Sequence, residues 1–301
     1  MRLIHSLSFL FLLLLVVACG RTTEMADREK YIREIEAWQQ LRIDSLKGKT
    51  GFLNLAGLFW LHQGANTIGS DSSNTFVFPA KAAAFLGTVV LDGDTVWFVQ
   101  HEPGLVQVSG NVTADTALVF VPDSVQRHMR FGDLNWFIIK RGKEYGIRLK
   151  DYNHPLLKTF NHIDTYPIDA RWRVTATWEP YERPKEVLLD NQVGMKIRQQ
   201  IPGAFHFEIR GEPYSLEPVG EPGEEGYFVM VYDQTSGRET YGSGRYLYVP
   251  VPDENGQTIL DFNKLFNPPC AFTPYATCLF LHAANRLPIK IEAGEKFSGH
   301  H

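Results

Sequence analysis

The spacing of apolar residues predicts one amphipathic helix near the beginning of the chain. Between residues 27 and 47, apolar side chains recur mostly at three- or four-residue intervals. Acidic Asp27 and Glu29 come early in this stretch and Lys47 comes late, as the helix dipole favours, and Gly48 offers a stop. We expect one face of this helix to pack on the body of the protein through Tyr31, Ile35, Trp38, Leu41, Ile43 and Leu46.

From Gly51 onward the pattern changes to short runs of β-branched and aromatic residues separated by Gly, Pro, Asn and Asp. Residues 91–94 and 141–143 are typical turn sequences between such runs. A spacing of roughly eight to twelve residues between runs indicates antiparallel β-structure. The sequence therefore predicts a mainly β fold, with antiparallel β-sandwich or barrel-like units and one N-terminal amphipathic helix.

A stretch rich in proline and charge, residues 179–192, is the best boundary between two β units, although it could equally be an excursion within one domain. We expect residues 27–178 to hold the helix and a first β unit. Residues 193–301 then form a second β unit that ends in a proline- and cysteine-rich tail.

The first residues have the pattern of a secretion signal. The run from Leu7 to Ala18, apolar apart from Ser8, is too short to span a bilayer comfortably but suits the core of a signal peptide. Val16, Val17 and Ala18 precede Cys19, and this stretch resembles a bacterial lipobox.

That resemblance implies a signal peptide at residues 1–18, a lipidated Cys19 at the mature N-terminus and a tether at residues 19–26. The protein would then be anchored to a membrane by lipid and face the periplasm. No aspartate follows Cys19, which favours the outer membrane. The alternative is a signal anchor, or an ordinary secretory signal with an incidental cysteine.

Composition narrows the class of partner. The chain has 30 basic and 34 acidic side chains, a formal charge of −4, and no basic block, which argues against a nucleic-acid partner. Cys270 and Cys278 would lie in an oxidising compartment, so a disulfide is the favoured reading. Two buried thiols, a thiolate metal site or a catalytic cysteine remain alternatives.

Several short sequence segments, which we call the family phrases, together resemble domain-of-unknown-function family 1684 over almost the whole mature chain. The most specific phrase is residues 261–278, and residues 285–296 follow it. The sequence departs from the family pattern at residues 279–282, where a proline-rich run is expected. The resemblance implies no settled activity. The other phrases are residues 51–74, 141–151, 166–174 and 233–247.

A weaker similarity lies within residues 51–120. Residues 64–71, followed by Asn74, are similar to the opening of forkhead-associated β-sandwiches. Ser70 stands where those domains use an arginine to hold phosphothreonine. The similarity therefore implies a fold and argues against phosphopeptide binding.

Arginine and tyrosine are prominent within the family phrases. Guanidinium groups bind carboxylate or phosphate bidentately, and tyrosines add donors and flat apolar surface. We expect several of these side chains to converge on a pocket for an anionic small molecule or a saccharide. The alternative is structural pairing with acidic neighbours such as Asp233 and Glu239. The expected ligand-binding residues are Arg141, Tyr145, Arg148, Tyr166, Arg173, Tyr241, Arg245 and Arg286.

Motifs for other chemistry are weak. Asp151, His154 and His162 lie in one loop-like segment whose spacing fits no metal motif, so no metal site is expected. Neither a Gly-x-Ser-x-Gly elbow nor a nucleotide-binding fingerprint is present, and no cofactor is expected.

Three functions remain open at this stage. The first is an envelope binding module with an Arg/Tyr pocket, the second is a hydrolase acting on an envelope ester or glycan, and the third is a structural scaffold. The sequence leaves catalysis and the oligomeric state open.

Overall fold

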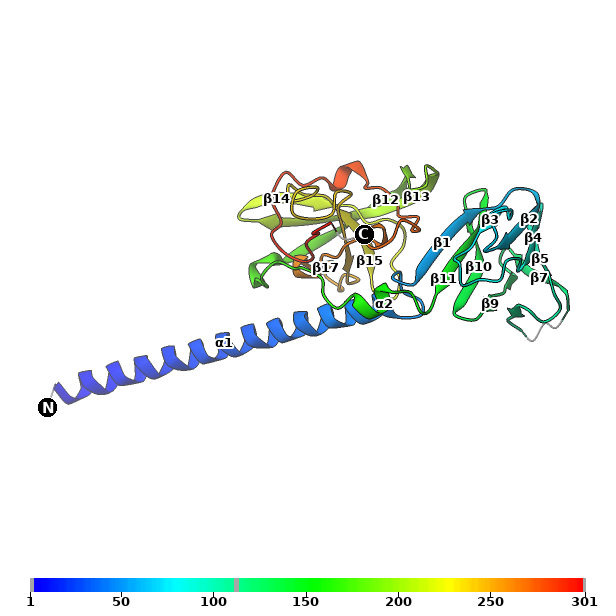
Figure 1. The fold of residues 1–301 in the computed structure, drawn as a ribbon. Helices are drawn as coiled ribbons and strands as arrows, with labels where there is room; N and C mark the ends of the chain where they lie inside the picture. Colours follow the sequence, from blue (N-terminus) through cyan, green and yellow to red (C-terminus); the bar gives the residue numbers. More distant parts are fainter. Residues whose placement is uncertain (1–2, 111–113, 300–301) are drawn as a thin grey trace.

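A computed structural model describes residues 3–110 and 114–299, with side chains from Met25 onward. A long helix, α1 (Leu3–Lys47), extends from a body of β-structure (Figure 1). The predicted helix at 27–47 forms its C-terminal half. The side chains of the predicted signal peptide and of Cys19 lie outside the described residues. Among the described residues, no helix has the length and apolar character needed to cross a membrane.

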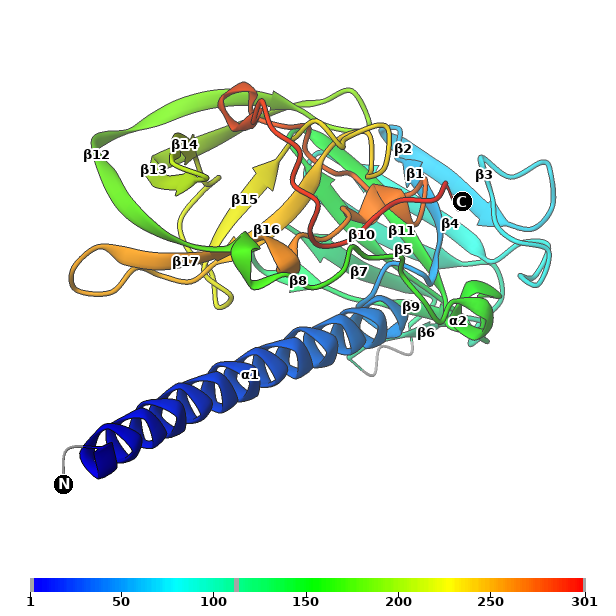
Figure 2. The same ribbon diagram turned by 90° about the vertical axis from the view of Figure 1, so that its left-hand side faces the viewer.

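The C-terminal half of α1 passes below the second β unit (Figure 2). Ile35 and Leu46 are completely buried, which confirms the predicted packing face at these two positions. Leu41 is instead 67% exposed, so its predicted packing is wrong. The reason is helical geometry, because the side that faces the body comprises residues four or seven apart, such as 35, 42 and 46, and Leu41 projects away from it.

The first β unit is a sandwich of two sheets. One sheet contains β2 (Gly64–Gly69), β3 (Phe76–Val77), β4 (Gly87–Asp92), β5 (Thr95–Gln100), β7 (Thr116–Val121) and β8 (Val125–Gln126), in the order β3-β2-β4-β5-β7-β8. The other contains β1 (Leu55–Trp60), β6 (Gln107–Val108), β9 (Met129–Phe131), β10 (Leu134–Arg141) and β11 (Glu144–Asp151), in the order β1-β11-β10-β9-β6.

Side chains of both sheets share one apolar core. Ile68 and Phe98 come from the first sheet, and Trp136 and Ile147 come from the second. All four are no more than 1% exposed. Alternating burial along β5 shows the antiparallel pattern in which one face meets the core and the other meets solvent.

The second β unit is built around β12 (Arg173–Asp190), which pairs with both of its neighbours. The larger sheet of this unit consists of β12 together with β13 (Lys196–Ile209), β14 (Glu212–Leu216) and β17 (Gln257–Asp261). Its strand order is β14-β13-β12-β17. A two-stranded sheet of β15 (Tyr227–Val231) and β16 (Arg245–Val249) packs on the same core as this sheet.

The predicted boundary at residues 179–192 lies inside this second unit. Trp172 and Ala176 belong to its core, and β12 continues through residues 179–190 with a break in register between Pro180 and Lys185. The proline- and charge-rich stretch is therefore an irregular part of a long hairpin. The chain passes between the two units in residues 152–172, through α2 (Leu156–Thr159) and the 3-10 turn η1 (Ala170–Trp172).

The proline- and cysteine-rich tail follows β17 as irregular chain with three short 3-10 turns, η2 (Phe262–Lys264), η3 (Pro269–Ala271) and η4 (Ala283–Asn285). A disulfide joins Cys270 to Cys278, as predicted. The backbone N–H of Gln192 donates to the carbonyl of Cys278 at 2.9 Å, which holds the loop at the end of the β12–β13 hairpin. We call residues 270–278 the disulfide loop.

Candidate functional site

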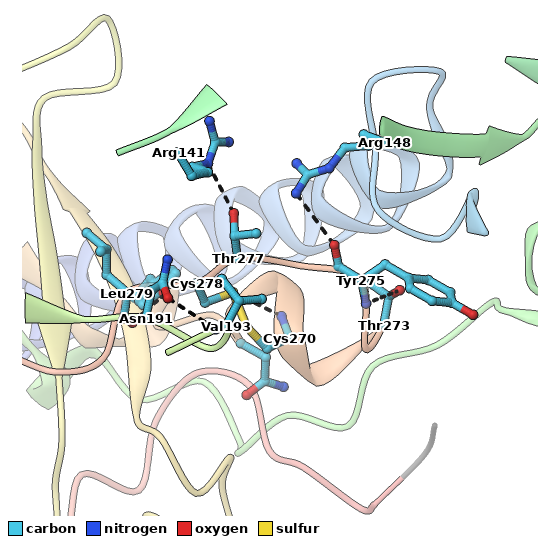
Figure 3. The surroundings of a disulfide bond; sticks show 12 residues. Arg141, Arg148, Asn191, Val193, Cys270, Thr273, Tyr275, Thr277, Cys278 and Leu279 are labelled. Atoms are coloured by element: carbon cyan, nitrogen blue, oxygen red, sulfur yellow. Dashed lines mark hydrogen bonds between the residues drawn. A yellow bond between two sulfur atoms is a disulfide. The ribbon is translucent and has the colours of Figure 1, made fainter. Parts of the chain in front are cut away.

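Two arginines of the first unit meet the disulfide loop of the second. Arg141 ends β10 and Arg148 lies within β11, and these two strands form an antiparallel hairpin. Arg141 Nε donates to Thr277 Oγ1 at 3.2 Å, and Arg148 Nη2 lies 3.5 Å from the carbonyl oxygen of Tyr275 (Figure 3). We call Arg141 and Arg148 the arginine pair.

Each acceptor that the arginine pair contacts is uncharged. Besides Thr277, Arg141 donates to the carbonyl of Lys140 at 2.8 Å. In the part of the chain that the structure describes, neither arginine forms an ion pair with a carboxylate. Arg148 Nε is buried and has no hydrogen-bond acceptor among the residues that the structure describes. A guanidinium has five N–H donors, so the pair keeps unused capacity for a ligand.

The electrostatic environment of the pair is strongly positive. Burial, followed by the charge of Arg141, lowers the pKa of Arg148 to about 10. Burial also lowers the pKa of Arg141. Farther along β11, burial and then the charge of Arg148 lower the pKa of Lys150 to about 8. The largest cause of all three shifts is burial, which removes positive charge from water.

The disulfide loop provides a stiff wall opposite the pair. The bond between Cys270 and Cys278 closes the loop, and Pro274 restricts its backbone. Cys270 N also donates to Cys278 Sγ at 3.2 Å, and Tyr275 N donates to Thr273 Oγ1 at 3.3 Å. A fixed loop facing two guanidinium groups can hold a carboxylate or phosphate bidentately.

The structure does not gather the other predicted ligand-binding residues at this place. Tyr145 is in the first unit, where its hydroxyl donates to Asp94 at 2.7 Å. Arg245 is 1% exposed and pairs with Asp233 at 2.7 Å. It also donates to the carbonyls of Ala293, Ile291 and Glu295. Both side chains are therefore engaged inside the protein.

The remaining four residues have separate partners; Tyr166 lies in the segment that connects the two units, and the other three lie in the second unit. The hydroxyl of Tyr166 donates to Glu239 at 2.9 Å, and Tyr241 packs edge-on against Phe297. Two guanidinium groups lie over aromatic rings, Arg173 over Tyr31 at 5.9 Å and Arg286 over Tyr232 at 4.4 Å.

These positions correct the expectation of one shared Arg/Tyr pocket. The physical reason is local pairing, because most of the predicted groups already meet an acid, a carbonyl or a ring near them. The structural alternative holds for Arg245 with Asp233, and Arg171 likewise pairs with Asp169. Only Arg141 and Arg148 come together at the same loop.

Sequence reasoning missed a polar cluster around Glu217, just after β14. Its carboxylate accepts from the hydroxyl of Tyr181 at 2.5 Å, from Lys185 Nζ at 2.7 Å and lies 2.6 Å from His282 Nε2. Burial acts to raise the pKa of Glu217, but the hydrogen bonds from Lys185, Tyr181 and His282 lower it overall. These residues come from three separate segments with no motif, so no sequence signal could have found them.

The segment of Asp151, His154 and His162 forms no metal site. The carboxylate of Asp151 forms an ion pair with Lys81, at 2.7 Å from Nζ. His162 pairs with Asp164. Across the described ranges, no group of three or more His, Cys, Asp or Glu side chains is arranged to hold a metal ion.

The fold thus defines a protein of two β units with an N-terminal helix docked on the second unit. Residues 158–296, which span most of that second unit, match the family described as "Protein of unknown function (DUF1684)". This match confirms the predicted family resemblance for that part of the chain. The phrases at residues 51–74 and 141–151 fall outside it. The lipobox and forkhead-associated resemblances stay predictions.

The chain is also similar to one solved structure of an uncharacterized protein from Haloarcula marismortui, determined by solution NMR. The two sequences are 24% identical, the alignment covers 48% of this chain and 80% of that chain, and the TM-score is 0.40. No curated protein matches the chain.

Proposed function

We propose that the protein is a lipid-anchored envelope protein that binds an anionic small molecule, or the acidic group of a saccharide, at the arginine pair. The observation that carries the proposal is the pairing of Arg141 and Arg148 against the disulfide loop, with no carboxylate of the described residues bound to either. Half-buried positive charge without a counter-charge is costly, and an anionic ligand would supply the missing partner.

The chemistry of the pair favours a carboxylate or a phosphate. Both are planar or tetrahedral groups whose oxygens match the fork of a guanidinium. The hydroxyl of Thr277 and the carbonyl of Tyr275 add neutral polar groups beside the arginines, which suits the hydroxyls of a sugar acid. This arrangement supports recognition, and it supplies no nucleophile paired with a base.

Membrane attachment rests on the sequence. The lipobox resemblance implies a lipid at Cys19, and α1 continues from there into the body. From Cys19 to Tyr31, whose hydroxyl donates to Asp261 at 2.8 Å, helical rise amounts to about 18 Å. On this proposal α1 is a stiff spacer between the membrane surface and the second unit, with the body in the periplasm and the lipid in the outer membrane.

A ligand-binding experiment tests the first part of the proposal. Titration calorimetry with inorganic phosphate and with galacturonate is run on the wild type, on Arg148→Gln and on Arg198→Gln. Arg198 is the matched control, because it is exposed and already paired with Glu186. We expect binding to the wild type and to the control, and loss of at least about tenfold in affinity in Arg148→Gln.

Equal affinity in all three proteins, or no binding of either anion, would contradict recognition at the arginine pair and favour a scaffold. Attachment is tested separately by expressing the wild type and Cys19→Ser. The wild type should fractionate with the outer membrane and carry an acylated N-terminal cysteine by mass spectrometry, whereas Cys19→Ser should not.

A further inference from the structure

A cavity lies between α2 and the C-terminal segment. It has a volume of about 440 Å³, within the range of sites for small organic ligands. The position of α2 beside the end of α1 can be followed in Figure 1. Lys47 Nζ donates to the carbonyl of Phe160 at 3.1 Å and so fastens this wall to α1.

The lining of this cavity is mainly apolar. Leu156 and Phe160 come from α2 and the residue after it, Ile163 comes from the following loop, and Ala271 and Phe272 come from the disulfide loop. The rings of Phe160 and Phe272 meet edge to face, with centroids 5.8 Å apart. Apolar and aromatic walls of this kind favour an apolar ligand body.

One polar group of the lining is unsatisfied. Asn267 is 1% exposed and lines the cavity. Its backbone N–H donates to Glu295 and its Nδ2 donates to the carbonyl of Lys296 at 2.9 Å, which fixes the orientation of the amide. Its Oδ1 is buried and accepts no hydrogen bond within the described structure. A buried acceptor without a donor is costly, and a ligand N–H or O–H that displaced the side chains covering Oδ1 would satisfy it.

The charged groups near this cavity are engaged with each other or with a ring. His162 Nε2 lies 3.1 Å from Asp164, and Lys296 Nζ lies 5.1 Å from the centre of the Tyr166 ring. None of the lining residues belongs to the arginine pair. This hollow is therefore a different site from the anion site, and its chemistry favours a neutral ligand.

We propose that this cavity binds a neutral, largely apolar small molecule whose single hydrogen-bond donor is held by Asn267 Oδ1. The apolar body lies against Phe160 and Phe272, and the donor lies at the inner, polar end. The site is independent of the arginine pair, so failure of one proposal leaves the other standing.

The test uses two fluorescent or absorbing probes of similar size. N-phenyl-1-naphthylamine is neutral and carries one N–H donor, whereas 1-phenylnaphthalene has none. Both are titrated into identically prepared full-length wild type, with the dissociation constants compared. We expect the amine to bind about tenfold more tightly than the hydrocarbon, which corresponds to one buried hydrogen bond.

The location is tested by filling the cavity from opposite walls. Thr159 and Ser298 are exposed residues that line it, so Thr159→Trp and Ser298→Trp place an indole there with little disturbance of the core. Lys158→Trp is the matched control, because Lys158 is adjacent, exposed and outside the lining. Thermal unfolding verifies that each variant is folded.

We expect either filling variant to abolish binding of the amine and Lys158→Trp to leave it unchanged. Unchanged binding in both folded filling variants, or no binding to the wild type, would overturn the proposed site. Equal affinity of the two probes would overturn the role of Asn267.

Discussion

Arg245 and Asp233 form an ion pair whose two side chains are both completely buried, with 2.7 Å between Nη2 and Oδ2. Arg245 also ties this pair to the C-terminal segment through the carbonyls of Ile291, Ala293 and Glu295. A residue predicted to bind a ligand therefore holds the last part of the chain against β16.

Removal of one partner of this pair should destabilise the protein strongly. Asp233→Ala leaves the buried charge of Arg245 without a counter-charge, and we expect the free energy of unfolding to fall by about 3–5 kcal/mol. Urea unfolding followed by tryptophan fluorescence measures it. Glu186→Gln is the control, since its partner Arg198 is exposed, and it should change stability by less than about 1 kcal/mol. Similar small losses in both variants would contradict the structural role of Arg245.

The opposite result is expected at the arginine pair. Arg148→Met keeps much of the side-chain volume but removes a desolvated charge that has no carboxylate partner. We expect the free energy of unfolding to stay constant or to rise by about 1 kcal/mol, as found where a functional site is kept at a cost in stability. A loss above about 2 kcal/mol in the same urea measurement would show that Arg148 is structural.

Lys150 should make stability depend on pH in the alkaline range. Burial and the charge of Arg148 lower its pKa to about 8 in the folded protein, against about 10.4 in an unfolded chain. Between these values the unfolded chain binds more protons than the folded one, so stability rises with pH.

We expect the unfolding free energy of the wild type to increase relative to that of Lys150→Met by about 1 kcal/mol per pH unit between about pH 8 and pH 9.5. Because the other titrating groups are common to both proteins, the difference reports Lys150. Parallel curves for the two proteins would show that the pKa of Lys150 is unchanged by folding.

The disulfide should contribute measurably to stability and to the anion site. Replacement of both Cys270 and Cys278 by serine removes a short cross-link and should lower the free energy of unfolding by about 2–3 kcal/mol. The affinity for phosphate should fall as well, because the loop that faces the arginine pair is no longer restrained by the disulfide. Mass spectrometry after alkylation, with and without reductant, verifies the bond. Modification of both thiols without reductant would contradict it.

The local features of the fold were accessible from the sequence. The turns at residues 91–94 and 141–143 form as predicted, with Gly93 and Gly142 at φ of 57° and 58°, because a short hairpin needs a positive φ that glycine adopts freely. Helix periodicity likewise located Ile35 and Leu46 on the packing face, and strand runs indicated the β class. The disulfide between Cys270 and Cys278 was also predicted correctly.

Long-range arrangement was not accessible in the same way. Residues 179–192 have the composition of a linker, yet β13 pairs with most of this stretch and makes it part of a sheet. The cluster of Glu217, Tyr181, Lys185 and His282 unites segments far apart in the chain. The spacing of residues along the sequence does not indicate such contacts.

The sequence by itself determined the helix, the β class, the likeness to its family and the chemical types available for a site, because these follow from local periodicity, turn geometry and residue chemistry. Only the tertiary structure decided which arginines form structural ion pairs and which lie at the candidate anion site. Arg245 and Arg148 are the same residue type, but the fold brings the carboxylate of Asp233 to one and the carbonyl of Tyr275 to the other. Whether a charge is satisfied depends on what the rest of the chain places beside it.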